Sequence, residues 1–146
     1  MSNLASLQEK MITLLTTKQS DSSSPDKPAQ IKGYEGELAN LKSVRVLPAV
    51  MVDVAQNFDI EADDVAASLF TGLYQPEIIL FSKNLTSGKE TLSGLARLAD
   101  WVIDALKSEV IMLDGPLEMS RRIRGRMITD MEPASCILTL ELRSPE

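Results

Sequence analysis

The chain has 146 residues, 44% of them apolar and 25% charged, and this length and composition predict a single globular domain over residues 1–146. The formal net charge of −6 argues against a protein whose whole surface contacts nucleic acid, so any basic site must be local. The absence of histidine excludes histidine-dependent catalysis and histidine metal ligands, and the lone Cys136 excludes thiolate zinc sites and disulfides within one chain.

Targeting and membrane signals are missing from the sequence. The N-terminal stretch MSNLASLQEKMITLL has no basic segment followed by an unbroken apolar run, so it is not a signal peptide. No stretch approaches the roughly 18 apolar residues that a membrane-spanning helix needs. The single Cys136 fits synthesis in a reducing cytoplasm. We therefore expect no contact with a membrane.

The first predicted element is an amphipathic helix over residues 2–19. Its apolar residues recur at intervals of three and four and form one stripe: Leu4, Leu7, Met11, Leu14 and Leu15. Residues 20–30 are rich in Ser, Asp, Lys and Pro. They predict a mobile loop that tethers the helix to an α+β core of residues 31–143.

The next two segments predict short extended elements. Gly33 and Gly36 punctuate residues 31–41, which predict a turn or a brief edge strand and then one helical turn. Residues 43–58 have β-branched residues at alternate positions and predict a half-buried strand. The strand should begin after Pro48 or lie at an edge there, because proline cannot donate a hydrogen bond to a neighbouring strand.

An acidic loop, a second strand and a long helix are expected to follow. Residues 59–68 are rich in carboxylates and predict a solvated loop. Residues 74–84 contain a continuous apolar run, which predicts a strand covered on both faces. Residues 87–108 show apolar residues at helical spacing, and Ser87 with Glu90 fits a capping box at the start of this helix.

The C-terminal part predicts a turn and two antiparallel strands. Residues 115–118 form the turn, and residues 120–129 and 135–143 alternate in the manner of strands joined into a hairpin. In the second of these strands Cys136 lies in line with alternate leucines, which predicts a buried and unreactive thiol.

Together these elements predict an α+β fold without internal repeats. Two main helices would pack on one face of a mostly antiparallel or mixed sheet of about four strands. This arrangement leaves the opposite face of the sheet for solvent or for a partner.

The strongest local charge comes from four arginines in the stretch MSRRIRGRMI: Arg121, Arg122, Arg124 and Arg126. On a strand, Arg122, Arg124 and Arg126 would share one face while the other face packs on the helices. Three readings stay open: a solvated face with local ion pairs, a contact with carboxylates of another protein, and a nucleic-acid surface. The third reading lacks the interleaved aromatic residues on which single-stranded bases stack.

The counterpart of this basic stretch is a cluster of four carboxylates: Asp59, Glu61, Asp63 and Asp64. Their spacing lacks the glycine and the final glutamate of a calcium-binding loop, so we expect no metal there. An acidic patch and a basic patch on one subunit can meet head to tail. Repeated around an axis, this contact closes a ring, which high salt should weaken.

Signatures of catalysis are also missing. The stretch LTSGKET at residues 85–91 has no upstream glycine, and a glutamate follows its lysine, so it is not a phosphate-binding loop. No nucleophile stands in a recognisable pattern with a base. We therefore expect no enzyme activity, no cofactor, and no catalytic, cofactor-binding or metal-binding residues.

Several segments resemble the tail proteins of Mu-like phages and prophages. The matching pieces are GYEGEL at 33–38, LPAVMVDV at 47–54, PEIILFSKN at 76–84 directly before a long helix, and ILTLELR at 137–143. The resemblance spans roughly residues 30–143. Within and beside it, the acidic segment 59–72 and the loop 20–30 match no family pattern.

The resemblance implies a tail terminator, or tail completion, protein of a contractile-tailed phage. Such a protein is a structural homohexameric ring that caps the tail tube and sheath, stops their polymerisation and joins the tail to the head–tail connector in the neck. It would assemble in the bacterial cytoplasm and become part of the virion. DNA would pass through its lumen without specific binding. The arginines would then contact carboxylates of a neighbouring subunit or tail partner, and acidic residues, including those at 59–64, would face the lumen or the subunit seam.

Two other classes of protein remain open at this stage. The first is a small adaptor that binds a protein partner through its N-terminal amphipathic helix. The second is a nucleic-acid-binding protein that uses the arginine strand. Discrete high-order oligomers would favour the ring, and DNA binding with a steep salt dependence would favour the nucleic-acid reading.

Overall fold

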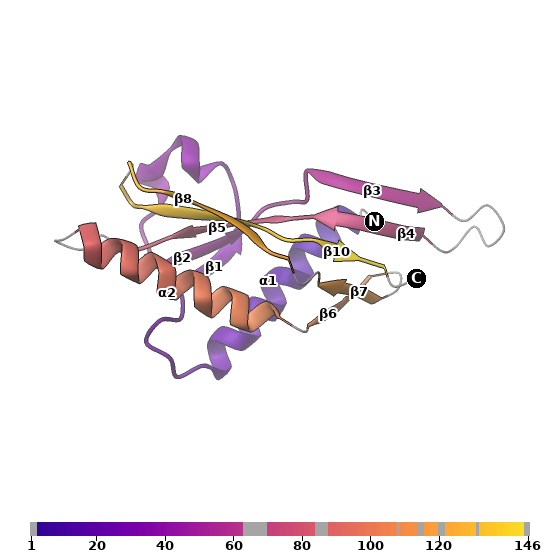
Figure 1. Ribbon diagram of the computed structural model, residues 1–146, viewed down its shortest axis with the longest axis horizontal. Coiled ribbons are helices and arrows are strands. Elements are labelled where there is room, and N and C mark those ends of the chain that lie inside the picture. Colours follow the sequence, from indigo (N-terminus) through magenta and orange to yellow (C-terminus); the bar gives the residue numbers. More distant parts are fainter. Residues whose placement is uncertain are drawn as a thin grey trace.

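The computed structural model describes residues 3–62, 70–83, 88–107, 109–113, 116–119, 122–130 and 132–144. Within these ranges the chain is an α+β fold of two long helices, two short 3₁₀ turns and two five-stranded sheets (Figure 1). The helices are α1 (Asn3–Asp21) and α2 (Gly88–Leu106), and the 3₁₀ turns are η1 (Glu37–Ala39) and η2 (Leu41–Ser43). The strands are β1 (Gln30–Gly33), β2 (Ala49–Val52), β3 (Asn57–Ala62), β4 (Phe70–Gln75), β5 (Glu77–Phe81), β6 (Val110–Met112), β7 (Pro116–Met119), β8 (Arg124–Ile128), β9 (Ser135–Thr139) and β10 (Leu142–Arg143).

Two long strands run through both sheets. The first sheet has the order β1-β2-β5-β9-β8 and the second has β3-β4-β10-β7-β6. Strand β4 leads into β5 across Pro76, and β9 leads into β10 across two residues, so both sheets share one central antiparallel pair. At the junction the N–H of Leu140 donates to the carbonyl oxygen of Pro76 at 3.0 Å. Among the described strands, all pairs are antiparallel except β1 with β2.

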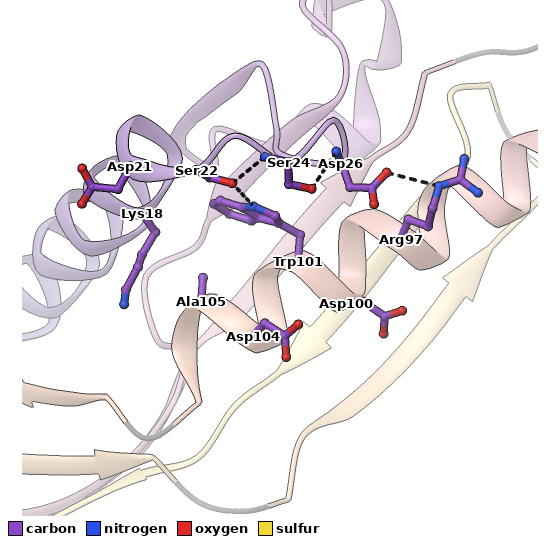
Figure 2. Close-up of a pocket in the computed structure, with 10 residues that line it drawn as sticks. All are labelled: Lys18, Asp21, Ser22, Ser24, Asp26, Arg97, Asp100, Trp101, Asp104 and Ala105. Atoms are coloured by element: carbon purple, nitrogen blue, oxygen red, sulfur yellow. Dashed lines mark hydrogen bonds and ion pairs between the residues drawn. The ribbon is translucent and has the colours of Figure 1, made fainter.

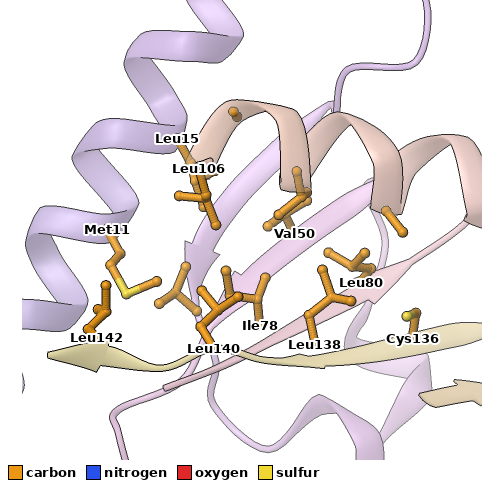
Figure 3. Packing of buried hydrophobic residues seen from close by; sticks show 14 of the residues in the cluster. Met11, Leu15, Val50, Ile78, Leu80, Leu106, Cys136, Leu138, Leu140 and Leu142 are labelled. Atoms are coloured by element: carbon orange, nitrogen blue, oxygen red, sulfur yellow. The ribbon is translucent and has the colours of Figure 1, made fainter. Parts of the chain in front are cut away.

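Both helices cover the same face of the first sheet. Helix α1 packs on β1 and β2, while α2 packs on β5 and β9. Figure 3 shows Met11 and Leu15 of α1 and Leu106 of α2 pointing toward the leucines of the central strands. The same hydrophobic cluster continues into the second sheet, where it includes Tyr74 and Leu142. The stripe predicted for the N-terminal helix is therefore the side that folds onto the core.

The opposite face of the first sheet has a smaller core of its own. Its buried members are Val44, Ala49, Met51, Ile79 and Phe81. The segment of residues 34–48, which contains η1 and η2, packs over them with Tyr34, Leu38, Leu41 and Leu47. Because this segment covers β2 and β5, the uncovered part of the face lies over β8 and β9.

The α+β class and the two helices are as the sequence predicts, whereas the strands differ in number and extent. About four strands were expected, and the described residues form ten. The single strand expected over residues 43–58 is split into a 3₁₀ turn, β2 after Pro48, and the start of β3. Pro48 contributes to this break, because proline cannot donate a hydrogen bond to a neighbouring strand. Pro76 likewise lies between β4 and β5.

Four further expectations are corrected at the C-terminal end and around the acidic segment. The strand expected over residues 120–129 is shorter, β8, and the strand expected over 135–143 is broken into β9 and β10. The predicted turn at 115–118 largely coincides with β7, which pairs with β6 and β10. Residues 59–62 of the expected acidic loop are strand, because they pair with β4 along its whole length. The antiparallel hairpin of β8 and β9 is confirmed.

Candidate functional site

The arginines of β8 lie on the sheet face that is turned away from the helices. In the register of β8 with β9, Arg124 lies opposite Thr139 and Arg126 opposite Ile137. The intervening positions of β9 are Leu138 and Cys136, which belong to the core beneath the helices. Arg124 and Arg126 are both exposed. The face predicted for these two side chains is thus the face that the structure shows.

These two guanidinium groups border a shallow hollow of about 310 Å³. Its other lining residues are Glu77, Gly125, Ile137 and Thr139. Among the ion pairs of the described residues, none involves Arg124 or Arg126. Arg122 is exposed ahead of β8, and Arg121 lies outside the described residues. The basic surface therefore consists of two strand arginines, and its nearest carboxylate in the sheet register is Glu77.

The acidic residues are divided between strand β3 and an undescribed stretch. Asp59 lies opposite Leu73 in β4, and Glu61 lies two positions further along the same strand. Asp59 is exposed and takes part in no ion pair among the described residues. Asp63 and Asp64 lie outside those residues.

The two charged strands are edge strands on opposite sides of the central pair. Strand β3 flanks β4 in the second sheet, and β8 flanks β9 in the first. In Figure 1, β8 lies in the left half of the molecule and β3 projects at the right. The tertiary structure thus places the described acidic strand residues, Asp59 and Glu61, apart from Arg124 and Arg126 within one chain.

Apolar side chains alternate with the charges on both edge strands. Phe58 is 50% exposed, Ile60 37% and Met127 44%. Large apolar groups at this exposure on an edge strand favour contact with another chain. This feature was not predicted from the sequence, although the alternation in NFDIEA is a signal for a strand with one apolar face.

A second hollow, of about 470 Å³, lies between the end of α1, the following loop and α2 (Figure 2). Its lining residues are Lys18, Asp21, Ser22, Ser24, Asp26, Arg97, Asp100, Trp101, Asp104 and Ala105. Trp101 Nε1 donates to Ser22 Oγ at 3.3 Å, and Arg97 Nε lies 3.3 Å from Asp26 Oδ1. These contacts attach the loop to α2.

The charges of this second hollow make it unsuited to anionic ligands. Four aspartates line it against two cationic side chains. Both cations already have partners, because Lys18 Nζ is 2.9 Å from Glu109 Oε1 and Arg97 pairs with Asp26. Phosphates would meet uncompensated carboxylates there. The hollow is accounted for by the docking of the loop, in which Gln19 Nε2 also donates to the carbonyl oxygen of Pro28 at 2.7 Å.

Cys136 is buried beneath the helices, as the alternation predicts. Its side chain is 2% exposed. Burial raises the pKa of the thiol above its ordinary value of 9.0, and a backbone hydrogen bond from Arg126 partly opposes this effect. A thiol that stays protonated and inaccessible at neutral pH is a poor nucleophile.

Neither a cluster of possible metal ligands nor a membrane-spanning helix is found in the described part of the chain. Within it, no three acidic or cysteine side chains converge to hold a metal ion. None of its helices is both long and apolar enough to cross a membrane. The expected capping box at α2 involves Ser87, which lies outside the described residues.

In comparisons with known proteins, no family model matches the chain and no curated protein matches its sequence.

Proposed function

We propose that this protein is a structural subunit that assembles with copies of itself into a ring, and that the ring acts as a tail terminator of a contractile-tailed phage. The observation that carries the ring is the position of the two charged edge strands on opposite sides of one molecule. Two different complementary surfaces on one subunit make a head-to-tail contact, and a head-to-tail contact closes into a ring when the rotation permits.

The tail terminator assignment comes from the sequence resemblance in GYEGEL, LPAVMVDV, PEIILFSKN and ILTLELR. It fits an acidic protein that carries two exposed arginines on one edge strand. A lumen lined by carboxylates lets DNA pass, because phosphates bind tightly to basic channels. In this assignment the partners are further copies of the chain, the tail tube and sheath proteins, and the head–tail connector.

The adaptor alternative is less favoured by the packing of α1. Leu7, Met11 and Leu15 have at most 1% of their surface exposed, because they form part of the main core. A partner that bound this apolar stripe would first have to displace α1 from the sheet. Such a displacement would expose three large apolar side chains to water, at a free-energy cost of about 1.5–3 kcal/mol for each.

The native mass of the full chain at two salt concentrations tests the ring. We expect a discrete oligomer, hexameric by the resemblance, at about 0.1 M salt and its partial dissociation at about 1 M, where charges are screened within about 3 Å. Native mass spectrometry with negative-stain electron microscopy would identify the ring directly. A chain that stays monomeric at low salt and high protein concentration would overturn the proposal.

Duplex DNA binding, measured by fluorescence anisotropy, separates the ring from the nucleic-acid alternative. The ring predicts weak binding near physiological salt, because only three described strand arginines, Arg124, Arg126 and Arg143, face solvent on a chain of net charge −6. Tight binding whose affinity falls steeply with salt would instead favour the nucleic-acid reading.

A further inference from the structure

We propose that adjacent subunits are joined by strand addition, with β3 of one copy pairing antiparallel to β8 of the next so that the sheets become continuous. This inference rests on the proposed ring and names the contact that builds it. Both strands are sheet edges, with β4 the only neighbour of β3 and β9 the only neighbour of β8 among the described residues. An edge strand presents unpaired N–H and C=O groups that a second strand can bind.

The two strands match in their charge pattern. Pairing Asp59 with Arg126 in an antiparallel register places Glu61 opposite Arg124. Both carboxylate positions then meet an arginine, and five residues of β3 pair with all five of β8. Opposite charges directly across from each other stabilise a strand pair.

The apolar residues match in the same register. Phe58 then lies opposite Met127, and Ile60 lies opposite Gly125. Phe58, Ile60 and Met127 are the apolar side chains of these strands that stay exposed in the single chain. Gly125 has no side chain, and Leu138 Cδ2 lies 3.1 Å from where its Cβ would be, so Ile60 would meet Leu138 at this position. The pairing would therefore remove three exposed apolar groups from water.

The sheet faces also agree between the two strands. Arg124 and Arg126 lie on the face away from the helices, because the alternate positions of β8 pair with core residues of β9. Asp59 lies on this same face, because the neighbouring position, Phe58, pairs with the core residue Tyr74. A continuous sheet therefore brings carboxylates to arginines on one face and apolar groups together on the other.

The strand directions select the antiparallel arrangement. Strand β8 runs in the same direction as the β4–β5 strand, since each is antiparallel to β9, whereas β3 runs opposite to β4. Two copies that lie in the same orientation and present the same face, with one shifted along the strands, therefore bring β8 and β3 together antiparallel. A parallel register would also pair the charges, but it would require the strands of one copy to run in the opposite direction to those of the other copy.

Disulfide trapping tests the register in the full chain. In a Cys136→Ala background, Phe58→Cys with Met127→Cys should give a ladder of covalent oligomers on a non-reducing gel after mild oxidation. Ala62→Cys with Met127→Cys is the matched control. In the antiparallel register this pair is four residues out of step, too far apart for a disulfide, so we expect cross-linking at least about tenfold slower. Faster trapping by the control pair, or dimers from Phe58→Cys alone, would overturn the inference.

A charge exchange tests the same contact without cysteines. Arg124→Glu with Arg126→Glu should abolish the oligomer, and adding Asp59→Arg with Glu61→Arg should restore it by exchanging the two sides. Circular dichroism of each variant shows that the monomer is folded. If the wild type forms rings but the Phe58→Cys, Met127→Cys variant does not cross-link, strand addition is rejected while the proposed ring function is retained. A wild-type monomer would reject both.

Discussion

The carboxylate of Glu37 is buried beside the ammonium group of Lys32, with 3.7 Å between Oε1 and Nζ. Glu37 is only 4% exposed, and its two oxygens accept the N–H of Glu35 at 2.7 and 3.0 Å. This carboxylate closes the turn at Gly36, whose φ of 90° suits glycine. The turn in turn positions the segment of residues 34–48 over the second core.

Replacing Glu37 should therefore loosen this segment. We expect Glu37→Ala to lower the free energy of unfolding by about 1–3 kcal/mol, because a buried acceptor of backbone hydrogen bonds is lost. Lys32→Ala should cost less than about 1 kcal/mol, since the Lys32 side chain is one-third exposed and its pair is screened. Urea unfolding of both variants measures the difference. Equal effects would show that the ion pair, and not the turn, is what the carboxylate provides.

Gly72 and Gly94 provide an opposed pair of alanine substitutions. A Cβ at Gly72 would lie 2.8 Å from Cε2 of Tyr74, whose ring is buried and has little freedom to move. Gly72→Ala should lower stability by about 1–3 kcal/mol through overpacking. At Gly94, within α2, the nearest heavy atom is 3.9 Å away, so Gly94→Ala should raise stability by about 0.5–1 kcal/mol. Thermal unfolding of the two variants would contradict this account if both shifted in the same direction.

Cys136 should react slowly with a thiol reagent in the folded chain and rapidly in denaturant. Its folded pKa is raised above 9.0 by burial, so the folded state keeps the proton longer than the unfolded state. The thiol's contribution to stability is then complete below pH 9.0 and is lost as the pH rises through the folded pKa. The free energy of unfolding of the wild type and of Cys136→Ala, measured from below pH 9.0 to above it, isolates the contribution of the thiol. The other titrating groups are common to both proteins. A difference in stability that stays constant with pH would refute it.

The helices and the hairpin were predictable because their signals are local. The apolar stripes of α1 and α2 repeat at the helical period within each segment, and the predicted ends fall within two residues of the observed ones. Likewise, the alternation around Cys136 predicts which side of β9 faces the core. The face of Arg124 and Arg126 follows from the same alternation.

The strands that were not predicted, or were predicted with other bounds, depend on partner strands that are distant in sequence. Residues 57–62 are acidic and were assigned mostly to a loop, yet they form β3 because β4 offers a complete antiparallel partner. Residues 116–119 contain a proline and an acidic residue, and become β7 only between β6 and β10. Strand formation of this kind depends on packing against neighbours more than on intrinsic preference.

By itself, the sequence determined the α+β class, the two helices, the buried thiol and the opposed charges of two segments, since each follows from residue type and local period. Only the tertiary structure decided that those segments are edge strands on opposite sides of one central pair. That placement depends on which strands meet across long stretches of chain, and it leaves the two sets of charges free to meet between copies.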